Sequence, residues 1–137
     1  LHLLLPNIEK NSDVLIVGNG PLVGKPLSHL LENMGYKVTS ISRKNDYDLI
    51  PELKKHRHIV SGVGVSGLIK DDMLLEDSIV IDAGTSESNG SVVGDVDFEK
   101  LTNKPKMLAP VPGGVGPLTV YFLMDNVVSV AERSLSN

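Results

Sequence analysis

A short apolar run that ends directly on a glycine-rich turn constrains the fold of this chain more than any other sequence feature. Gly18 follows Val14-Leu15-Ile16-Val17 at once, and Gly20 and Gly24 come next. Such near-continuous apolar runs are typical of parallel strands that are covered on both faces of a sheet. Beyond the turn, apolar residues recur at helical spacing, at Val23, Leu27, Leu30, Leu31 and Met34. The segment therefore predicts a buried parallel strand, a glycine turn and a helix.

The same alternation continues to the end of the chain. It predicts further strands over residues 37–41, 59–63, 78–82 and 106–109, with short helices over 46–55 and 71–74. A final helix has an apolar face formed by Val120, Leu123, Met124, Val127, Val128, Ala131 and Leu135. Right-handed crossovers between parallel strands place helices on both faces of the sheet. The predicted fold is therefore α/β, a Rossmann-like doubly wound parallel sheet in three α/β/α layers.

The length and composition fit one globular domain without a nucleic-acid or membrane partner. The 137 residues are 41% apolar and 22% charged, with a net charge of −4 and only 4% aromatic residues. The apolar runs are shorter than the about 18 residues of a membrane helix. Absence of cysteine fits a reducing compartment, so we expect a cytoplasmic location and leave a mitochondrial one open.

We assign residues 14–137 to one Rossmann-like domain and residues 1–13 to an incoming tail or linker. Because the chain opens on Leu1 rather than Met, we expect a fragment or a processed form.

The glycine turn has the context of a nucleotide-binding loop, since it follows a strand and opens a helix. Gly18 and Gly20 allow the backbone to approach a pyrophosphate, and the helix N-terminus offers N–H groups and the positive end of its dipole. We expect cofactor contacts from the whole loop, at Gly18, Asn19, Gly20, Val23 and Gly24. The alternative is a glycine turn of an α/β fold that binds no nucleotide.

The end of the second predicted strand favours NADP over NAD. An NAD-specific site generally has an acidic residue about 20 residues beyond the glycines, where it holds the ribose hydroxyls. This chain has Ser42, Arg43 and Lys44 instead. A hydroxyl and a guanidinium can pair with a 2′-phosphate, so we assign Ser42 and Arg43 to the cofactor site. The alternative is that the cations only solvate a loop.

A rigid, bare-backbone segment lies between the last strand and the final helix. Residues 110–119 contain three prolines and three glycines. Such a segment can lie flat against a planar ligand. A strand-to-helix connection needs only about two to six residues, so the run predicts a ligand-facing surface, with a purely architectural loop as the alternative.

Four segments in order carry a family resemblance. They are Gly18 to Pro26, Ile81 to Gly84, Gly94 to Phe98, and the run PVPGGVGPLT at 110–119. They resemble the GRSxxVGxP loop, the IDVG strand end, the GDVDF element and the C-terminal signature of the bifunctional methylenetetrahydrofolate dehydrogenase/methenyltetrahydrofolate cyclohydrolase family. The match covers only that family's nucleotide-binding half. Asn19 and Gly20 stand where the family's loop usually has Arg and Ser.

The resemblance implies an enzyme that oxidises methylenetetrahydrofolate with NADP and hydrolyses the product to formyltetrahydrofolate. Its catalytic Lys and Tyr belong to a preceding domain that this sequence does not contain, so we expect no catalytic residue and no turnover here. The resemblance also implies a homodimer. By resemblance the cofactor also contacts Val63, Gly64, Gly84 and Thr85, and one wall of the folate site is formed by Pro112, Gly113, Gly114, Val115, Gly116 and Thr119. The alternative is a free-standing, non-catalytic dinucleotide-binding or assembly module of the same fold.

The remaining polar residues suggest no second chemistry. Asp82, Asp95 and Asp97 could suggest acid/base work or a metal, but we expect Asp95 to brace the turn after Gly94 through its own backbone. The histidines lack a zinc-binding spacing. We therefore predict no metal site.

Overall fold

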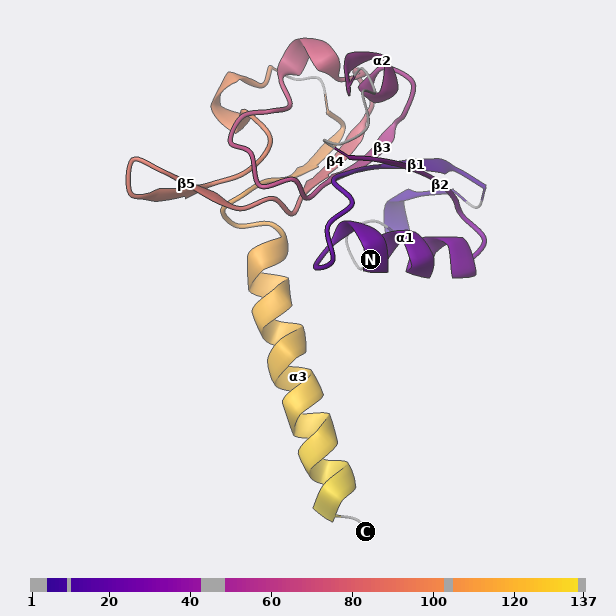
Figure 1. Cartoon of the computed structure of the whole chain (residues 1–137), viewed down its shortest axis with the longest axis vertical. Helices are drawn as coiled ribbons and strands as arrows, with labels where there is room; N and C mark the ends of the chain where they lie inside the picture. Colours follow the sequence, from indigo (N-terminus) through magenta and orange to yellow (C-terminus); the bar gives the residue numbers. More distant parts are fainter. Residues whose placement is uncertain (1–4, 10, 43–48, 103–104, 136–137) are drawn as a thin grey trace.

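The centre of the molecule is a parallel sheet of five short strands: β1 (Asp13–Val17), β2 (Lys37–Ile41), β3 (His58–Ser61), β4 (Ile79–Asp82) and β7 (Met107–Ala109). Their order in the sheet is β2-β1-β3-β4-β7. The computed structural model describes residues 5–9, 11–42, 49–102 and 105–135 (Figure 1). The chain passes from β1 to β2 on one side and later to β3 on the other, so the order reverses between β1 and β3.

Both faces of the sheet are covered, which explains why its strands are apolar without interruption. Successive side chains of a strand point to opposite faces, and β1 accordingly contributes Leu15 to one apolar cluster and Ile16 to the other. The first cluster includes Leu53 from the short helix α2 (Leu49–Leu53), and the second includes Leu31 from α1 (Gly24–Asn33). Figure 1 shows α1 and α2 on opposite sides of the sheet. The predicted α/β fold is confirmed.

The final helix, α3 (Val115–Leu135), leaves the layered part of the molecule and projects away from it (Figure 1). None of its described residues is buried, and Val120, Leu123 and Val127 are 58–59% exposed. The sequence predicted the helix and its apolar positions, but these positions do not pack on the sheet. Hydrophobic periodicity identifies a face that needs covering without identifying what covers it. In the described part of the chain, no helix combines the length and hydropathy needed to cross a membrane.

A two-stranded hairpin that the sequence analysis missed follows β4. Its strands, β5 (Ser86–Ser88) and β6 (Ser91–Val93), pair antiparallel and extend from the side of the sheet (Figure 1). Asn89 and Gly90 form the turn with φ of 52° and 77°. An Asn-Gly pair between two short strands is a strong hairpin signal. The sequence analysis did not predict the hairpin because its two short strands are rich in serine and contain few apolar residues.

Smaller differences concern element boundaries. The expected helix over 46–55 is the five-residue α2, with residues 46–48 outside the described part, and that over 71–74 is the 3-10 turn Asp71–Met73. β1 begins at Asp13, and Ile8 is 8% exposed within the α1-side cluster. Part of the expected incoming tail therefore packs on the domain.

Candidate functional site

The carboxyl ends of β1 and β3 meet where the strand order reverses, which is where open α/β sheets bind ligands. Two turns lie there: the glycine loop (residues 18–24) after β1 and the β3 turn (residues 62–65). The Gly62 N–H donates to the Val17 carbonyl at 2.8 Å, and a Cβ added to Gly18 would come within 2.7 Å of the Gly62 carbonyl oxygen. The two turns therefore pack backbone against backbone.

The three glycines of the loop have different structural roles, although the sequence analysis assigned all three to the cofactor site. Gly18 has a φ of +104°, and a Cβ on Gly24 would overlap the Gly18 carbonyl group, so both are required by the packing of the loop itself. A Cβ on Gly20 would meet no atom within 4 Å. Gly20 is thus the loop glycine whose missing side chain leaves open space beside the backbone.

The start of α1 fits an anionic group. Val23 precedes the helix with no side-chain hydrogen bond capping it, and the first turn contains no acidic residue. Asn19 is exposed beside it. Backbone N–H groups and the helix dipole favour a phosphate at such a position, so the residues present fit a dinucleotide pyrophosphate.

The neighbouring strand end is described only in part. Ser42 directly follows β2, which pairs with β1, and it is half-buried. This places Ser42 at the same sheet edge as the glycine loop. Arg43 and Lys44 lie outside the described residues, so the predicted 2′-phosphate contact of Arg43 stays a prediction from the sequence.

The β3 turn is held by a fully buried carboxylate, that of Asp95. Its Oδ2 accepts hydrogen bonds from Ser61 Oγ at 2.6 Å and the Val63 N–H at 2.7 Å, and its Oδ1 accepts one from the Val65 N–H at 2.7 Å. The expectation that Asp95 braces the turn after Gly94 through its own backbone is therefore wrong. The donors lie 30–34 residues earlier in the chain, and no local sequence pattern reports such a contact.

Asp82, at the end of β4, is the second fully buried carboxylate. It accepts hydrogen bonds from the N–H groups of Gly84 and Val96, both at 2.9 Å. Burial raises the pKa of Asp82 above its ordinary value, although these hydrogen bonds act to lower it. The nearby negative charge of Asp95 also raises the pKa. Asp97 instead pairs with the exposed Lys100 at 2.8 Å. Among the described residues, no group of three or more His, Asp or Glu side chains could hold a metal ion.

Two glycines make room for these carboxylates. A Cβ on Gly84 would overlap the Asp95 carboxyl group, and one on Gly94 would overlap that of Asp82. Gly84 was predicted to contact the cofactor; it is buried, and its closest constraint is the carboxylate behind it.

We expect Gly84→Ala to lower the free energy of unfolding by about 2–3 kcal/mol, because the new methyl group displaces a buried, hydrogen-bonded carboxylate. Urea unfolding followed by circular dichroism measures the change. Gly116→Ala is the matched control, since a Cβ there meets nothing within 4 Å, and it should be neutral or stabilising. Equal stability of the two variants would contradict the expectation.

The Pro/Gly segment lines an apolar cavity of about 460 Å³ between the end of β4 and the start of α3. Most residues predicted to form the folate wall line it, namely Pro112, Gly113, Val115, Gly116 and Thr119. Gly114 packs inward instead, because a Cβ there would come within 2.6 Å of the Pro110 carbonyl oxygen. Thr85, predicted to lie beside the cofactor, is also part of the lining.

A second apolar cavity, of about 320 Å³, lies between α1 and α3 and includes Val23 of the glycine loop. Ala83, Val115 and Thr119 line both cavities. The structure thus brings the glycine loop and the Pro/Gly segment to one edge of the sheet, with the end of β4 between them. Neither lining contains an ionisable side chain among the described residues.

Comparisons with known proteins agree with this geometry. Residues 5–135 match the family model described as tetrahydrofolate dehydrogenase/cyclohydrolase, NAD(P)-binding domain. The bifunctional protein FolD of Hydrogenobaculum sp. (strain Y04AAS1) is 44% identical over 130 residues, which are 94% of this chain and 46% of that protein. FolD of Aquifex aeolicus is 42% identical over 130 residues, covering 93% of this chain and 44% of that protein. The chain thus spans about half the length of the curated relatives it matches.

Solved structures show the same relationship. The bifunctional enzyme FolD of Campylobacter jejuni superposes with a TM-score of 0.83 at 36% identity, over 91% of this chain and 44% of that one. The Trypanosoma brucei methylenetetrahydrofolate dehydrogenase-cyclohydrolase, solved with NADP cofactor and inhibitor, gives 0.86 at 30% identity, over 99% of this chain and 49% of that one. The chain therefore belongs to the tetrahydrofolate dehydrogenase/cyclohydrolase family, whose NAD(P)-binding domain it matches.

Proposed function

We propose that this chain is the cofactor-binding half of an enzyme that oxidises 5,10-methylenetetrahydrofolate to 5,10-methenyltetrahydrofolate with NADP and hydrolyses the product to 10-formyltetrahydrofolate. The observation that carries the proposal is the convergence of the glycine loop and the Pro/Gly segment at one edge of the sheet, with Ala83 lining both cavities. This arrangement supports adjoining sites for a dinucleotide and a folate. The family match supports it, as does the NADP cofactor in the Trypanosoma brucei structure.

In the proposed complex, the chain's own residues bind and orient. The open space at Gly20 and the start of α1 receive the pyrophosphate, while Ser42 and Arg43 receive the 2′-phosphate. The β3 turn and Thr85 line the nicotinamide side. NADP, when bound, supplies a hydride acceptor. The apolar lining of the larger cavity faces the space that we assign to the reacting folate carbon.

The general acid/base groups are proposed to come from the half of the enzyme that precedes this chain. Neither cavity offers an ionisable side chain among the described residues. The larger cavity continues onto Val120 of α3, whose neighbours Leu123 and Met124 are exposed. A contiguous exposed apolar face of a helix is typical of an interaction site. We therefore assign the covering of α3 to that preceding half.

A free-standing, non-catalytic dinucleotide-binding or assembly module is the second candidate function. Asn19 and Gly20 favour it, because they replace the Arg and Ser usual in the family's loop. Restoration of turnover by the preceding half would exclude it. A homodimer and a cytoplasmic location stay predictions from the sequence; sedimentation equilibrium of the full-length enzyme tests the first.

The unmutated chain is expected to bind NADP⁺ more tightly than NAD⁺, and Arg43→Ala is expected to cost about 1–3 kcal/mol of NADP⁺ affinity, the range for a charge-assisted contact. Affinity for NAD⁺, which lacks the 2′-phosphate, should stay unchanged. Calorimetric titration with both cofactors measures this.

Arg57→Ala is the matched control. It also removes one guanidinium, but Arg57 lies before β3, at the opposite edge of the sheet, and pairs with Asp77 at 2.5 Å. Equal affinity of the unmutated chain for NADP⁺ and NAD⁺ would overturn the assignment of Ser42 and Arg43. Binding of neither cofactor would overturn the proposed function.

A further inference from the structure

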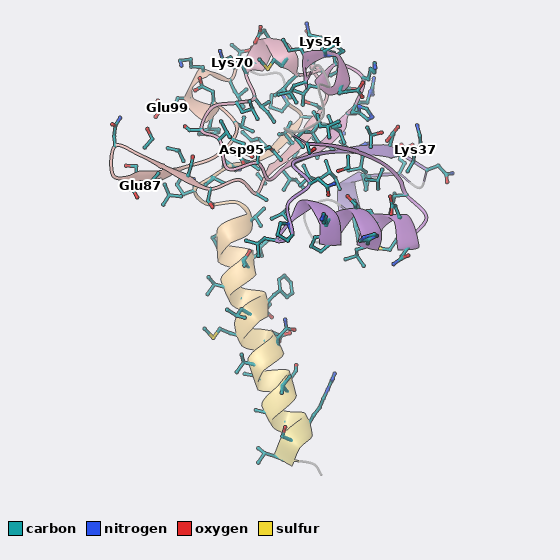
Figure 2. The ribbon with its side chains drawn as sticks, in the orientation of Figure 1. Lys37, Lys54, Lys70, Glu87, Asp95 and Glu99 are labelled. Atoms are coloured by element: carbon teal, nitrogen blue, oxygen red, sulfur yellow. The ribbon has the colours of Figure 1, made fainter. Side chains whose placement is uncertain are left out.

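Asp95 lies in the interior, whereas the other labelled charged residues lie at the periphery of the molecule (Figure 2). Its side chain is fully buried, and its three hydrogen-bond donors all belong to β3 or the turn that follows. Two of the donors are backbone N–H groups, those of Val63 and Val65. The carboxylate therefore fixes the path of the main chain through the β3 turn.

In the part of the chain that the structure describes, no cation balances the burial of this carboxylate. Among the described residues, no Lys, Arg or His side chain forms an ion pair with Asp95, and its neighbour is the second buried carboxylate, Asp82. Burying a charge is costly, and hydrogen bonds must offset that cost. If position 95 contributed only packing, an apolar side chain there would stabilise the fold more than a buried carboxylate does. The three hydrogen bonds to the β3 turn are what the carboxylate provides.

Asp95 is itself held from the other side. Its carboxyl group occupies the space beside Gly84, where a Cβ would overlap it. Gly94 packs against both the Asp82 carboxylate and Val111 of the Pro/Gly segment, because a Cβ added to it would overlap both. The segment carrying Asp95 is therefore fixed against the end of β4 and the Pro/Gly segment.

The topology assigns the two turns to different halves of a dinucleotide. The glycine loop and the end of β2 lie on one side of the point where the strand order reverses, and the β3 turn lies on the other. The adenine half with its 2′-phosphate belongs to the first side. The nicotinamide half crosses to the second.

We propose that Asp95 is a positioning residue for the nicotinamide half of the cofactor: its carboxylate holds the β3 turn in the conformation that this half requires, while the adenine half binds independently of it. The inference rests on the proposed function. A turn that is already ordered costs no conformational entropy when the ligand binds, whereas a loosened turn must be ordered at the expense of affinity. Loss of the Asp95 hydrogen bonds therefore weakens only ligands that reach the β3 turn.

Two probes separate these effects on the 137-residue chain: NADP⁺, which reaches both sides, and 2′,5′-ADP, which contains only the adenine half. Asp95→Asn keeps the shape of the side chain but replaces one carboxylate oxygen by an NH₂ group, which cannot accept a hydrogen bond from the donors that face it. We expect it to weaken NADP⁺ binding about tenfold, which corresponds to about 1.4 kcal/mol, and to change 2′,5′-ADP binding by less than about twofold. Calorimetry gives both affinities, and circular dichroism checks that the variant is folded.

Two further variants complete the test. Asp97→Asn is the matched control, because that carboxylate pairs with the exposed Lys100, and both affinities should stay unchanged. Ser61→Ala removes one of the three donors and leaves the charge in place. It should weaken NADP⁺ selectively by about threefold, and it decides the outcome if Asp95→Asn does not fold.

The possible results are distinct. Selective loss of NADP⁺ affinity supports the positioning role. Equal loss of both probes, or no loss of either, in a folded variant overturns it and leaves the proposed function intact. If the unmutated chain binds neither probe, the proposed function and this inference both fail.

Discussion

The 137-residue chain alone is expected to form no NADPH from methylenetetrahydrofolate above background, and the preceding half of a FolD relative is expected to raise the rate by at least about 10²-fold. General acid/base groups typically contribute about 10²–10⁴-fold in rate, and neither cavity contains such a group among the described residues. The half of the Aquifex aeolicus protein that this chain does not match, fused before Leu1 or added as a separate polypeptide, is the proposed source of these groups. Absorbance of NADPH measures the reaction.

The exposed helix offers a matched control for this complementation. Leu123→Asp and Asn126→Asp each add one carboxylate to α3, but only Leu123 belongs to the apolar face that extends from the larger cavity. If the preceding half covers this face, Leu123→Asp should abolish rescue by a separately added half, and Asn126→Asp should not. Both variants should still bind NADP⁺, since α3 lies outside the glycine loop.

Two outcomes would contradict this prediction. Robust turnover by the chain alone would mean that its own side chains supply the acid/base chemistry. A folded fusion that binds NADP⁺ and still lacks turnover would instead favour the non-catalytic module.

Gly20→Val is expected to reduce NADP⁺ affinity by more than about 100-fold, equivalent to more than about 2.7 kcal/mol, while leaving the fold intact. The β-branched side chain enters space that no protein atom occupies within 4 Å of its Cβ, and that space is the proposed place of the pyrophosphate. The φ of Gly20 lies outside the positive region, so valine adds no left-handed strain. Calorimetry with NADP⁺ and thermal unfolding followed by circular dichroism measure the two effects separately.

Gly24→Val gives the opposite pattern and serves as the comparison. Its Cβ would overlap the Gly18 carbonyl group at the start of α1, so the variant should lose cooperative unfolding and cofactor affinity together. Unchanged NADP⁺ affinity in Gly20→Val would place the pyrophosphate elsewhere. Unfolding of Gly20→Val would show that this glycine, like Gly24, is required by packing.

Most of the fold could be predicted from local pattern, because periodicity and turn chemistry act over a few residues. The apolar run at 14–17 gave β1 within one residue, and residues 37–41 gave β2 without error. The missed hairpin carried its signal in Asn89 and Gly90, which lay between strands with too little apolar content to be recognised. The candidate nucleotide loop followed from the same reasoning, since its glycines come directly after a predicted strand and open a helix.

The sequence by itself determined the strand–turn–helix units and the place of the glycine loop directly after β1, since each depends on residues close together in the chain. The tertiary structure alone decided three things: which loop glycine is open, what Asp95 holds, and where α3 lies. These depend on contacts between segments far apart in sequence, as between Asp95 and Val65 or between Gly84 and Asp95. In the sequence, a buried carboxylate such as Asp95 looks like a turn residue, and an exposed apolar helix such as α3 looks like a core helix. Only the packing of the folded chain distinguishes them.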